Sequence, residues 1–570
     1  MADPLLTLRP RLAAAIESAF GAEYAGTDPV LRRSDKADYQ ANAAMALAKR
    51  VGQSPRDIAQ AIVDHADLAG VVASTEVAGP GFINLTLDSA FLASCVADET
   101  APRAEHPETV VVDYSAPNVA KEMHVGHLRS TIIGDALVRV LEAQGNTVIR
   151  QNHIGDWGTQ FGMLIEHLLD LDWESSADHS IADLNALYQQ AQTKFRSDEA
   201  FAERARRRVV LLQAGDEQTL AIWRDLVAES ERHFELIYER LGVRLTPADI
   251  CAESFFNPVL DEVAAELEAK GLARIDDGAL CVFPPGFTGR EGEPLPLIVR
   301  KSDGGYGYQA TDLAAVRHRT RDLDGTRLIY VVGAPQAQHL AMVIAVAKEA
   351  GWLDEGRRAE HVAFGSILGE DRKPYKTRSG ENIKLIDLLD EAVERASAEV
   401  AEKNPDLDPG TAADVARQIG IGAVKYADLA NDRVKDYVFD WDRMLSFDGN
   451  TAPYLQYAHA RIRSIFRRAE ADGADAGAVA ITEPAERALA LQLISFDEVV
   501  QATAESLQPH RLAGYLFDLA QAFTSFYEAC PVLRADTPEQ RASRLALCGV
   551  TGRTLARGLD LLGIEAPDQM

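Results

Sequence analysis

Apolar and polar positions along the chain divide it into segments of different secondary structure. Near the start, apolar residues recur at helical spacing over residues 12–20, 39–50 and 56–65, and an extended run over 71–87 carries Gly79-Pro80-Gly81 in its middle. This mixture predicts a small α/β domain over residues 1–107. A polar stretch over residues 101–108 then marks a domain boundary.

The clearest pattern after this boundary is a strand, a helix and a second strand in succession. Residues 110–114 form a short β-rich run of the type that is buried in parallel sheets. A loop over 115–123, a helical pattern over 124–142 closed by Gly145, and a second strand over 147–151 follow. Because parallel strands need such a crossover, the segment predicts a βαβ unit within a Rossmann-like domain over residues 108–385.

Charged helical patterns interrupt that domain and also occupy the end of the chain. Residues from 168 to about 270 are helical and densely charged, which predicts a helical insertion within about residues 168–295. Strand patterns return at 297–300 and 328–332, and a helical pattern covers 339–348. Connecting helices are expected over 386–440 and an all-helical bundle over 441–570. The predicted class is therefore α/β: a Rossmann-like parallel sheet with a helical insertion, a small N-terminal α/β domain and a C-terminal all-α bundle.

Composition is that of a large globular protein. The 570 residues are 47% hydrophobic and 25% charged, which predicts about three to five domains of ordinary size. The 5 cysteines are isolated from one another, so they favour a reducing, cytoplasmic location over a disulfide framework or a local zinc knuckle. Residues 1–20 lack the order of an export signal, and no run approaches the ~18 apolar residues of a membrane span, so no membrane partner is expected.

The charge balance restricts how the chain could bind a polyanion. With 58 basic and 87 acidic side chains, the formal net charge is −29, which opposes unspecific attraction to nucleic acid. A nucleic-acid partner would therefore have to bind a local basic patch.

The loop between the first predicted strand and helix carries the most informative chemistry. His124, Gly126 and His127 stand at a helix N-terminus beyond the carboxyl end of a parallel strand, where free N–H groups and the helix dipole attract phosphate. Gly126 leaves room for a flat base or ribose. The two histidines share a helix face and can both donate to phosphate oxygens as charge builds up in an in-line displacement. Adenylyl transfer is predicted; the alternatives are a capped helix with ordinary histidines or a metal pair, and the 13 histidines show no third ligand cluster for a metal.

Four strings, in this order, make the sequence similar to class I aminoacyl-tRNA synthetases, and among them to the arginyl-tRNA synthetases of bacterial type. They are His124-Val125-Gly126-His127 within residues 113–135, Gly155-Asp156-Trp157-Gly158-Thr159-Gln160, Tyr308-Gln309-Ala310-Thr311-Asp312, and Tyr454-Leu455-Gln456-Tyr457-Ala458-His459. The resemblance implies ATP-dependent activation of L-arginine to an adenylate, with Mg²⁺ accompanying ATP, and transfer to tRNA(Arg) in translation. It also implies that residues 1–107 recognise the D-loop of tRNA, that 386–440 contact its stem, and that 441–570 bind the anticodon.

One segment departs from the pattern of that class. Its lysine-rich KMSKS loop corresponds here to residues 373–380, where Ser379 replaces the usual second lysine. Lys121, just before the two histidines, is a flexible ammonium that could neutralise the triphosphate instead. Lys376 and Arg378 would supply the remaining positive charge, and the alternative for these residues is a solvated loop.

The resemblance also implies the two small-molecule sites. ATP would contact His124, Gly126, His127 and His339, and arginine would contact Asp113, Asn118, Tyr308, Asp312 and Gln336. A guanidinium requires planar, bidentate acceptors, so Asp312 with Tyr308 is expected to hold it, while Asp113 and Asn118 hold the ammonium and carboxylate side. Because such a pocket rejects lysine and citrulline directly, no editing site is expected.

Contacts with tRNA are expected at both ends of the chain. Tyr457, Arg461, Tyr527 and Met570 are the candidates in the C-terminal bundle, where aromatic and basic residues interleave. Phe82 and Asn84 are the candidates in the N-terminal domain. The alternatives are an amphipathic helix with a basic face and an ordinary strand.

Two other functions are weighed against this one. A small-molecule adenylyltransferase would have no use for the C-terminal bundle, and a non-catalytic tRNA-binding relative would be expected to lose one of the histidines. A monomer is expected.

Overall fold

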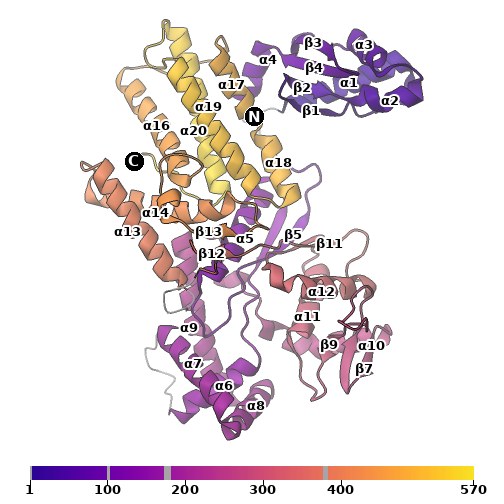
Figure 1. Cartoon of the computed structure of the whole chain (residues 1–570), viewed down its shortest axis with the longest axis vertical. Coiled ribbons are helices and arrows are strands. Elements are labelled where there is room, and N and C mark those ends of the chain that lie inside the picture. The colour runs from indigo at the N-terminus through magenta and orange to yellow at the C-terminus, as the bar shows by residue number, and fades with distance from the viewer. Residues whose placement is uncertain (1–2, 99–102, 172–180, 376–382) are drawn as a thin grey trace.

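The regions predicted from the sequence succeed one another in the computed structural model, which describes residues 3–98, 103–171, 181–375 and 383–570. The parallel sheet lies in the middle of the molecule, the C-terminal helices lie above it, and the helices of the insertion lie below (Figure 1). The N-terminal domain projects to one side, beside the C-terminal helices (Figure 1).

The N-terminal domain is an antiparallel sheet with helices, in the order β1-β2-β4-β3. Its elements are α1 (Pro4–Phe20), η1 (Ala22–Tyr24), β1 (Leu31–Ser34), β2 (Ala37–Ala41), α2 (Ala43–Val51), α3 (Pro55–His65), β3 (Val72–Ala78), β4 (Phe82–Leu87) and α4 (Ser89–Ala97). The expected helix over 39–50 is wrong at its start, because Tyr39 lies in β2, paired on both sides and buried. The extended run expected over 71–87 is present as two strands, β3 and β4, which turn back at Gly79-Pro80-Gly81 and pair antiparallel.

The predicted βαβ unit is confirmed in the Rossmann-like domain. Strand β5 (Thr109–Asp113), helix α5 (Val125–Ala143) and strand β6 (Thr147–Gln151) follow one another, and β5 pairs with β6 in parallel. The domain continues with α11 (Tyr308–Arg321), β10 (Arg327–Tyr330), η4 (Ala334–Gln336), α12 (Ala337–Glu349) and β11 (Arg358–His361). The strand order is β11-β10-β5-β6, so the carboxyl ends of β5, β6 and β10 lie along one edge of the sheet.

The insertion is only partly helical. It contains α6 (Thr159–Asp170), α7 (Ile181–Ser197), α8 (Glu199–Gln213), α9 (Glu217–Leu241), η2 (Pro247–Asp249), η3 (Glu253–Val259) and α10 (Leu260–Ala269), and then β7 (Ala273–Asp276) and β8 (Ala279–Val282). The strand expected at 297–300 is present as β9 (Leu297–Arg300), but it pairs antiparallel with β8 in a separate sheet, β7-β8-β9. The tight turn at Asp277 and Gly278 joins β7 to β8 as an antiparallel hairpin, and β9 extends this hairpin. A strand of the parallel sheet would instead need a long crossover connection before it.

The C-terminal part is a helical bundle, as predicted, and it packs directly on the Rossmann-like domain. Its elements are β12 (Ile367–Leu368), α13 (Leu385–Lys403), α14 (Pro409–Leu429), β13 (Tyr437–Val438), α15 (Trp441–Met444), α16 (Ala452–Ala471), α17 (Pro484–Leu493), α18 (Phe496–Ser506), α19 (His510–Ala529) and α20 (Pro538–Leu561). Helices α14, α18 and α20 contact α5, which explains why α5 is buried on nearly all sides. Within the described ranges, none of the helices has the length and apolar character needed to cross a membrane.

Candidate active site

The N-terminus of α5 is capped by the two histidines of the predicted phosphate site. His124 is the N-cap residue, and its Nδ1 accepts a hydrogen bond from the backbone N–H of Gly126 at 3.0 Å. The Nδ1 of His127 accepts from the backbone N–H of His124 at 3.1 Å, so the two residues form a capping box. Because a backbone N–H can only donate, each neutral ring must carry its proton on Nε2. Both imidazoles therefore offer an Nε2–H donor beyond the helix end.

Both histidines are neutral over the physiological pH range. Burial lowers the pKa of His127 to about 3, and the neighbouring His124 and Lys121 add to this effect. Burial and the Lys121 ammonium also lower the pKa of His124. A Cβ on Gly126 would lie 2.7 Å from Cε1 of His124. The direct reason for glycine at this position is therefore the space taken by the capping imidazole, whereas the sequence suggested space for a base or ribose.

The loop between β5 and α5 has an unusual backbone. Ser115, Ala116 and Ala120 have φ values of 72°, 47° and 60°, in the left-handed region that costs a non-glycine residue on the order of 1–3 kcal/mol. Asn118, between them, is exposed and lies against Gly155. A Cβ on Gly155 would lie 2.5 Å from Oδ1 of Asn118, so glycine at 155 allows the carboxamide its position. The surrounding structure therefore holds the loop in a backbone conformation that is unfavourable for these three residues in an isolated chain.

A cluster of ionisable side chains lies beyond the carboxyl ends of the same strands. Asp312 of α11 contacts two imidazoles: Nε2 of His339 lies 2.5 Å from its Oδ2, and Nε2 of His153 lies 3.7 Å from its Oδ1. Nδ1 of His153 bonds the carbonyl oxygen of Cys251 at 2.9 Å, which places its proton on Nδ1 and leaves Nε2 unprotonated in the neutral ring. Tyr308 packs its ring edge-on against His339 at a centroid distance of 5.0 Å and is 54% exposed.

Glu253 adds a second carboxylate to this cluster. Its backbone N–H donates to the carbonyl oxygen of Ile154, which follows β6. Burial raises the pKa of the Glu253 carboxyl to about 8, and the nearby negative charges of Asp312 and Asp156 add to the rise. Among the ion pairs of the described residues, none involves Glu253. The cluster therefore concentrates negative charge beyond the carboxyl ends of the strands, which favours binding of a cation there.

Comparisons with known proteins place this arrangement in a family. The family described as tRNA synthetases class I (R), catalytic domain, matches residues 91–441, the arginyl tRNA synthetase N terminal domain matches 6–87, and the DALR anticodon binding domain matches 455–570. The arginine–tRNA ligase of Thermobifida fusca is 57% identical over 100% of both chains. Two solved structures are also similar: the arginyl-tRNA synthetase of Plasmodium falciparum (TM-score 0.84, 28% identity, 100% of both chains) and that of Thermus thermophilus (TM-score 0.82, 30% identity, 99% of this chain and 100% of the other).

The chain belongs to the arginyl-tRNA synthetase family. It is a class I aminoacyl-tRNA synthetase, a ligase, and family models match its N-terminal, catalytic and anticodon-binding domains, as the resemblance implied.

One predicted substrate contact of the synthetase is engaged within the fold. Asp113, at the end of β5, is 7% exposed, and its Oδ2 accepts from Nη2 of Arg319 at 2.9 Å. Nε of Arg319 also bonds Oε1 of Gln151, and its guanidinium stacks over the ring of Tyr330. Oδ2 of Asp113 is therefore paired with a buried guanidinium of the chain itself, whereas its Oδ1 bonds no other described residue, and the expected contact of Asp113 with arginine stays a prediction. Residue type and strand position alone could not distinguish the two partners.

Other predicted contacts of the synthetase are placed at the same edge of the sheet. Gln336 is exposed at the N-terminus of α12, the helix that carries His339 in its first turn. The ammonium of Lys121 lies 4.6 Å from the ring centroid of Tyr188 in α7. Lys121 is also close enough to both capping histidines to lower their pKa values.

Of the segment that replaces the KMSKS loop, only residues 373–375 are described, and Lys376, Arg378 and Ser379 lie outside the described residues. After the gap, the backbone N–H of Leu385 donates to the carbonyl of Met123, and that of Val125 donates to the carbonyl of Ile383. The chain that follows the gap is therefore bonded to the loop on both sides of His124.

The predicted tRNA contacts of the bundle fall into two groups. Arg461 of α16 stacks on the ring of Tyr527 of α19 at 4.4 Å, and Tyr457, one turn earlier on α16, is 46% exposed. The chain end, with Met570, runs along the same helix: Asp568 accepts from Nε of Arg463 at 2.9 Å, and its carbonyl accepts from Arg467. Several cations of the predicted basic patch are therefore paired within the chain.

The N-terminal candidates lie on one face of the antiparallel sheet. Asn84 is 5% exposed, and its Oδ1 accepts from Gln40 at 2.9 Å, while Phe82 is partly exposed two residues earlier. Strand register aligns Arg32, Gln40, Asn84 and Glu76 across the four strands. A polar row thus crosses this face, with the Asn84 amide part of it.

Two residues of the cation pocket were missed by sequence reasoning. His153 directly follows β6, and the rule that ligands bind beyond the carboxyl ends of parallel strands could have pointed to it. Glu253 gives no such indication, because it belongs to the insertion and reaches the sheet edge only through its bond to Ile154.

Proposed function

We propose that this synthetase joins L-arginine to tRNA(Arg) in two steps. The carboxylate of arginine attacks the α-phosphorus of ATP, which forms arginyl-adenylate and releases pyrophosphate. A hydroxyl of the terminal ribose of tRNA then attacks the activated carbonyl carbon, which forms arginyl-tRNA and releases AMP. The observation that carries the choice of arginine is the cluster of Glu253 and Asp312: Asp312 contacts only imidazoles among the described basic side chains, and Glu253 forms no ion pair with a described residue.

The amino-acid pocket suits a guanidinium better than any other common side chain. A guanidinium is planar and permanently charged, and it presents several N–H donors in fixed directions. Asp312 accepts from it on one side and Glu253 on the other, and binding of the cation favours the ionised form of Glu253. The exposed Tyr308 ring covers the pocket edge, Asn118 faces the ammonium and carboxylate end, and Gln336 lies at the rim.

The phosphate chemistry is carried by neutral donors and one mobile cation. The Nε2–H groups of His124 and His127 donate to the phosphate oxygens, most strongly when negative charge has built up in the transition state. His339, which already bonds Asp312, links the arginine pocket to the ATP side. Lys121 leaves the ring of Tyr188 to neutralise the departing pyrophosphate, with Lys376 and Arg378 completing the charge.

Contacts with tRNA are proposed at aromatic, basic and amide side chains of two domains. Tyr457, Arg461 and Tyr527 offer stacking surfaces next to a cation for unpaired anticodon bases, and the chain end with Met570 borders them. Phe82 and Asn84 would take an extruded base of the D-loop. These sites are local, as the net charge of −29 requires.

Three further properties belong to this proposal. Mg²⁺ enters with ATP as part of that substrate; among the described residues, no group of three or more His, Cys, Asp or Glu could hold a metal ion. The synthetase acts as a monomer, and it works in the cytoplasm, where its substrates are made and used.

ATP–pyrophosphate exchange, run with each amino acid in the presence and in the absence of tRNA(Arg), tests the proposal. Arginine alone among the protein amino acids should support exchange. Exchange with another amino acid in place of arginine, or no exchange with any amino acid, would refute the assignment. Exchange with a small acid that no tRNA accepts would point to an adenylyltransferase.

A further inference from the structure

Helix α9 of the insertion runs past the strained loop that carries the phosphate-binding histidines. Three polar side chains of this helix reach the loop from positions along its second half: Ser230, His233 and Tyr238. All three are buried. Since polar groups at buried helix positions are costly unless they are bonded, their partners indicate what they do.

Each of these side chains bonds the loop. Oγ of Ser230 accepts from the backbone N–H of Ala120 at 2.9 Å, and Nε2 of His233 accepts from that of Met123 at 3.4 Å. The hydroxyl of Tyr238 bonds Oγ of Ser115 at 2.7 Å.

The same tyrosine also reaches the loop through a neighbour. Its hydroxyl accepts from Nδ2 of Asn152 at 3.0 Å, and Oδ1 of Asn152 accepts from the backbone N–H of Ala116 at 3.0 Å. The bonded positions Ser115, Ala116 and Ala120 are the three residues of the loop with left-handed backbone.

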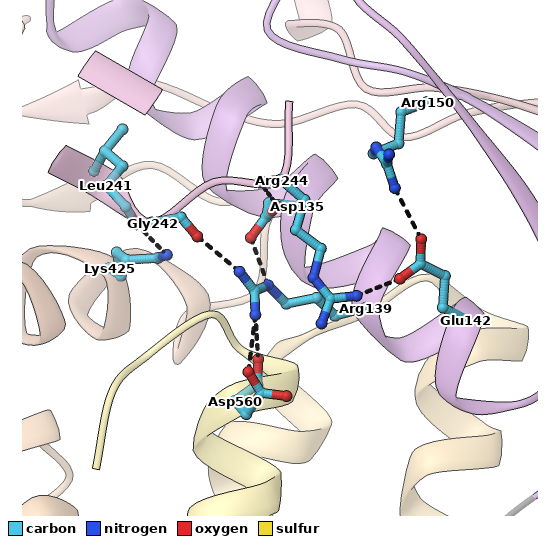
Figure 2. Close-up of polar contacts among 9 residues, drawn as sticks. All are labelled: Asp135, Arg139, Glu142, Arg150, Leu241, Gly242, Arg244, Lys425 and Asp560. Carbon is cyan, nitrogen blue, oxygen red and sulfur yellow. Dashed lines mark hydrogen bonds and ion pairs between the residues drawn. The ribbon is translucent and has the colours of Figure 1, made fainter. Parts of the chain in front are cut away.

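The C-terminal end of α9 is itself fixed to the rest of the synthetase, as Figure 2 shows. Lys425 of α14 donates to the carbonyl oxygen of Leu241 at 2.7 Å, and Nη2 of Arg139 of α5 donates to that of Gly242 at 2.7 Å (Figure 2). Both cations stand where the helix dipole is negative. Arg139 is held in turn by Asp135 of α5 and by Asp560 of α20 (Figure 2).

We infer that Tyr238 and Ser230 are positioning residues for adenylate formation: from a helix that is anchored at its end, they hold the loop in the strained conformation that aims Asn118, Lys121 and the capping histidines at the substrates. Neither residue touches the reacting atoms in this arrangement. Their role rests on the proposed function, because it is adenylate formation that the loop would serve.

The test compares the removal of two α9 hydroxyls that bond the loop with the removal of a nearby hydroxyl that does not. Tyr238→Phe and Ser230→Ala should each lower kcat of arginine-dependent ATP–pyrophosphate exchange, per titrated active site and with tRNA present, about tenfold or more. KM for tRNA should not change. Tyr114→Phe is the matched control, since the Tyr114 hydroxyl is buried next to the loop and bonds no other described residue; it should leave kcat unchanged.

A rescue experiment separates positioning from general destabilisation. Glycine adopts φ near 60° without strain, so Ala120→Gly should restore most of the kcat lost in Ser230→Ala, although it adds no contact. Equal kcat values for Tyr238→Phe and Tyr114→Phe, or no recovery in the Ser230→Ala/Ala120→Gly double variant, would overturn the positioning role. Absence of arginine-dependent exchange in the unaltered chain would instead refute the proposed function.

Discussion

We expect Glu253 to make arginine binding depend on pH. In the free synthetase its pKa is raised to about 8 by burial, reinforced by Asp312 and Asp156, so the carboxyl is mostly protonated at neutral pH. A bound guanidinium favours the carboxylate, and arginine therefore binds with release of a proton. The fraction ionised rises from about 1% at about pH 6 to about half at pH 8, so the affinity for arginine should rise about 50-fold over that range.

Calorimetric titration of arginine at several pH values, in two buffers of different ionisation enthalpy, measures both the affinity and the protons released. The unaltered synthetase should release about one proton near pH 6.5. Glu253→Gln should bind arginine more weakly at pH 8 and should lose both the proton release and this part of the pH dependence. Affinity for ATP, measured in parallel, should not follow the same curve.

Glu253→Gln, which should weaken arginine binding, should at the same time increase the stability of the fold. The pKa of Glu253 is higher in the folded state than in the unfolded state, so the free energy of unfolding falls as pH rises from about 4.5 to about 8. Glu253→Gln removes that penalty and should raise the melting temperature above pH 8 while it lowers activity. The electrostatic role of Glu253 would be refuted if Glu253→Gln bound arginine with the wild-type pH dependence, or if it were less stable than the unaltered synthetase at high pH.

Three other predictions concern the chemistry and its selectivity. His127→Asn should lower kcat of exchange by the equivalent of about 2.7 to 4 kcal/mol with little change in the KM for ATP, and a wild-type rate would remove the imidazole from the mechanism. Lys121→Ala should impair activation far more than an exposed lysine substitution does, and Ser379→Lys should restore part of it; a double variant no better than Lys121→Ala would refute the compensation. Canavanine keeps the guanidinium plane, so it should be charged to tRNA and remain attached after ATP and amino acid are removed, whereas rapid enzyme-dependent deacylation would reveal an editing activity.

How far the sequence could lead differs between the local and the assembled parts of the site. The βαβ unit was predictable because its periodicities are local: a buried apolar strand, a helix closed by a glycine, and a second strand. The position of His124 and His127 at a helix N-terminus was predictable for the same reason, since they are three residues apart, whereas the sequence offers their mutual capping bonds only as an alternative. The strand at 297–300 was found, but its sheet was not, because pairing depends on which strand lies beside it.

The cation pocket shows the limit most clearly. Asp113 and Glu253 are both acidic, and nothing nearby in the sequence separates their roles. Packing places Arg319 against Oδ2 of Asp113, whereas Glu253 is buried near Asp312 and Asp156 and forms no ion pair with another described residue. Which carboxylate is paired within the chain is decided by distances between segments about a hundred residues apart or more.

By itself, then, the sequence determined the βαβ unit, the further strand near 328–332 and the helix N-terminus that carries His124 and His127, because these follow from spacings of a few residues. Tertiary structure alone decided the anchoring of the strained loop by α9, the pairing of Asp113 with Arg319, and the raised pKa of Glu253. Burial and electrostatic interaction depend on separation in space, and contacts such as Ser115 with Tyr238 or Lys425 with Leu241 join residues that only the complete fold brings together.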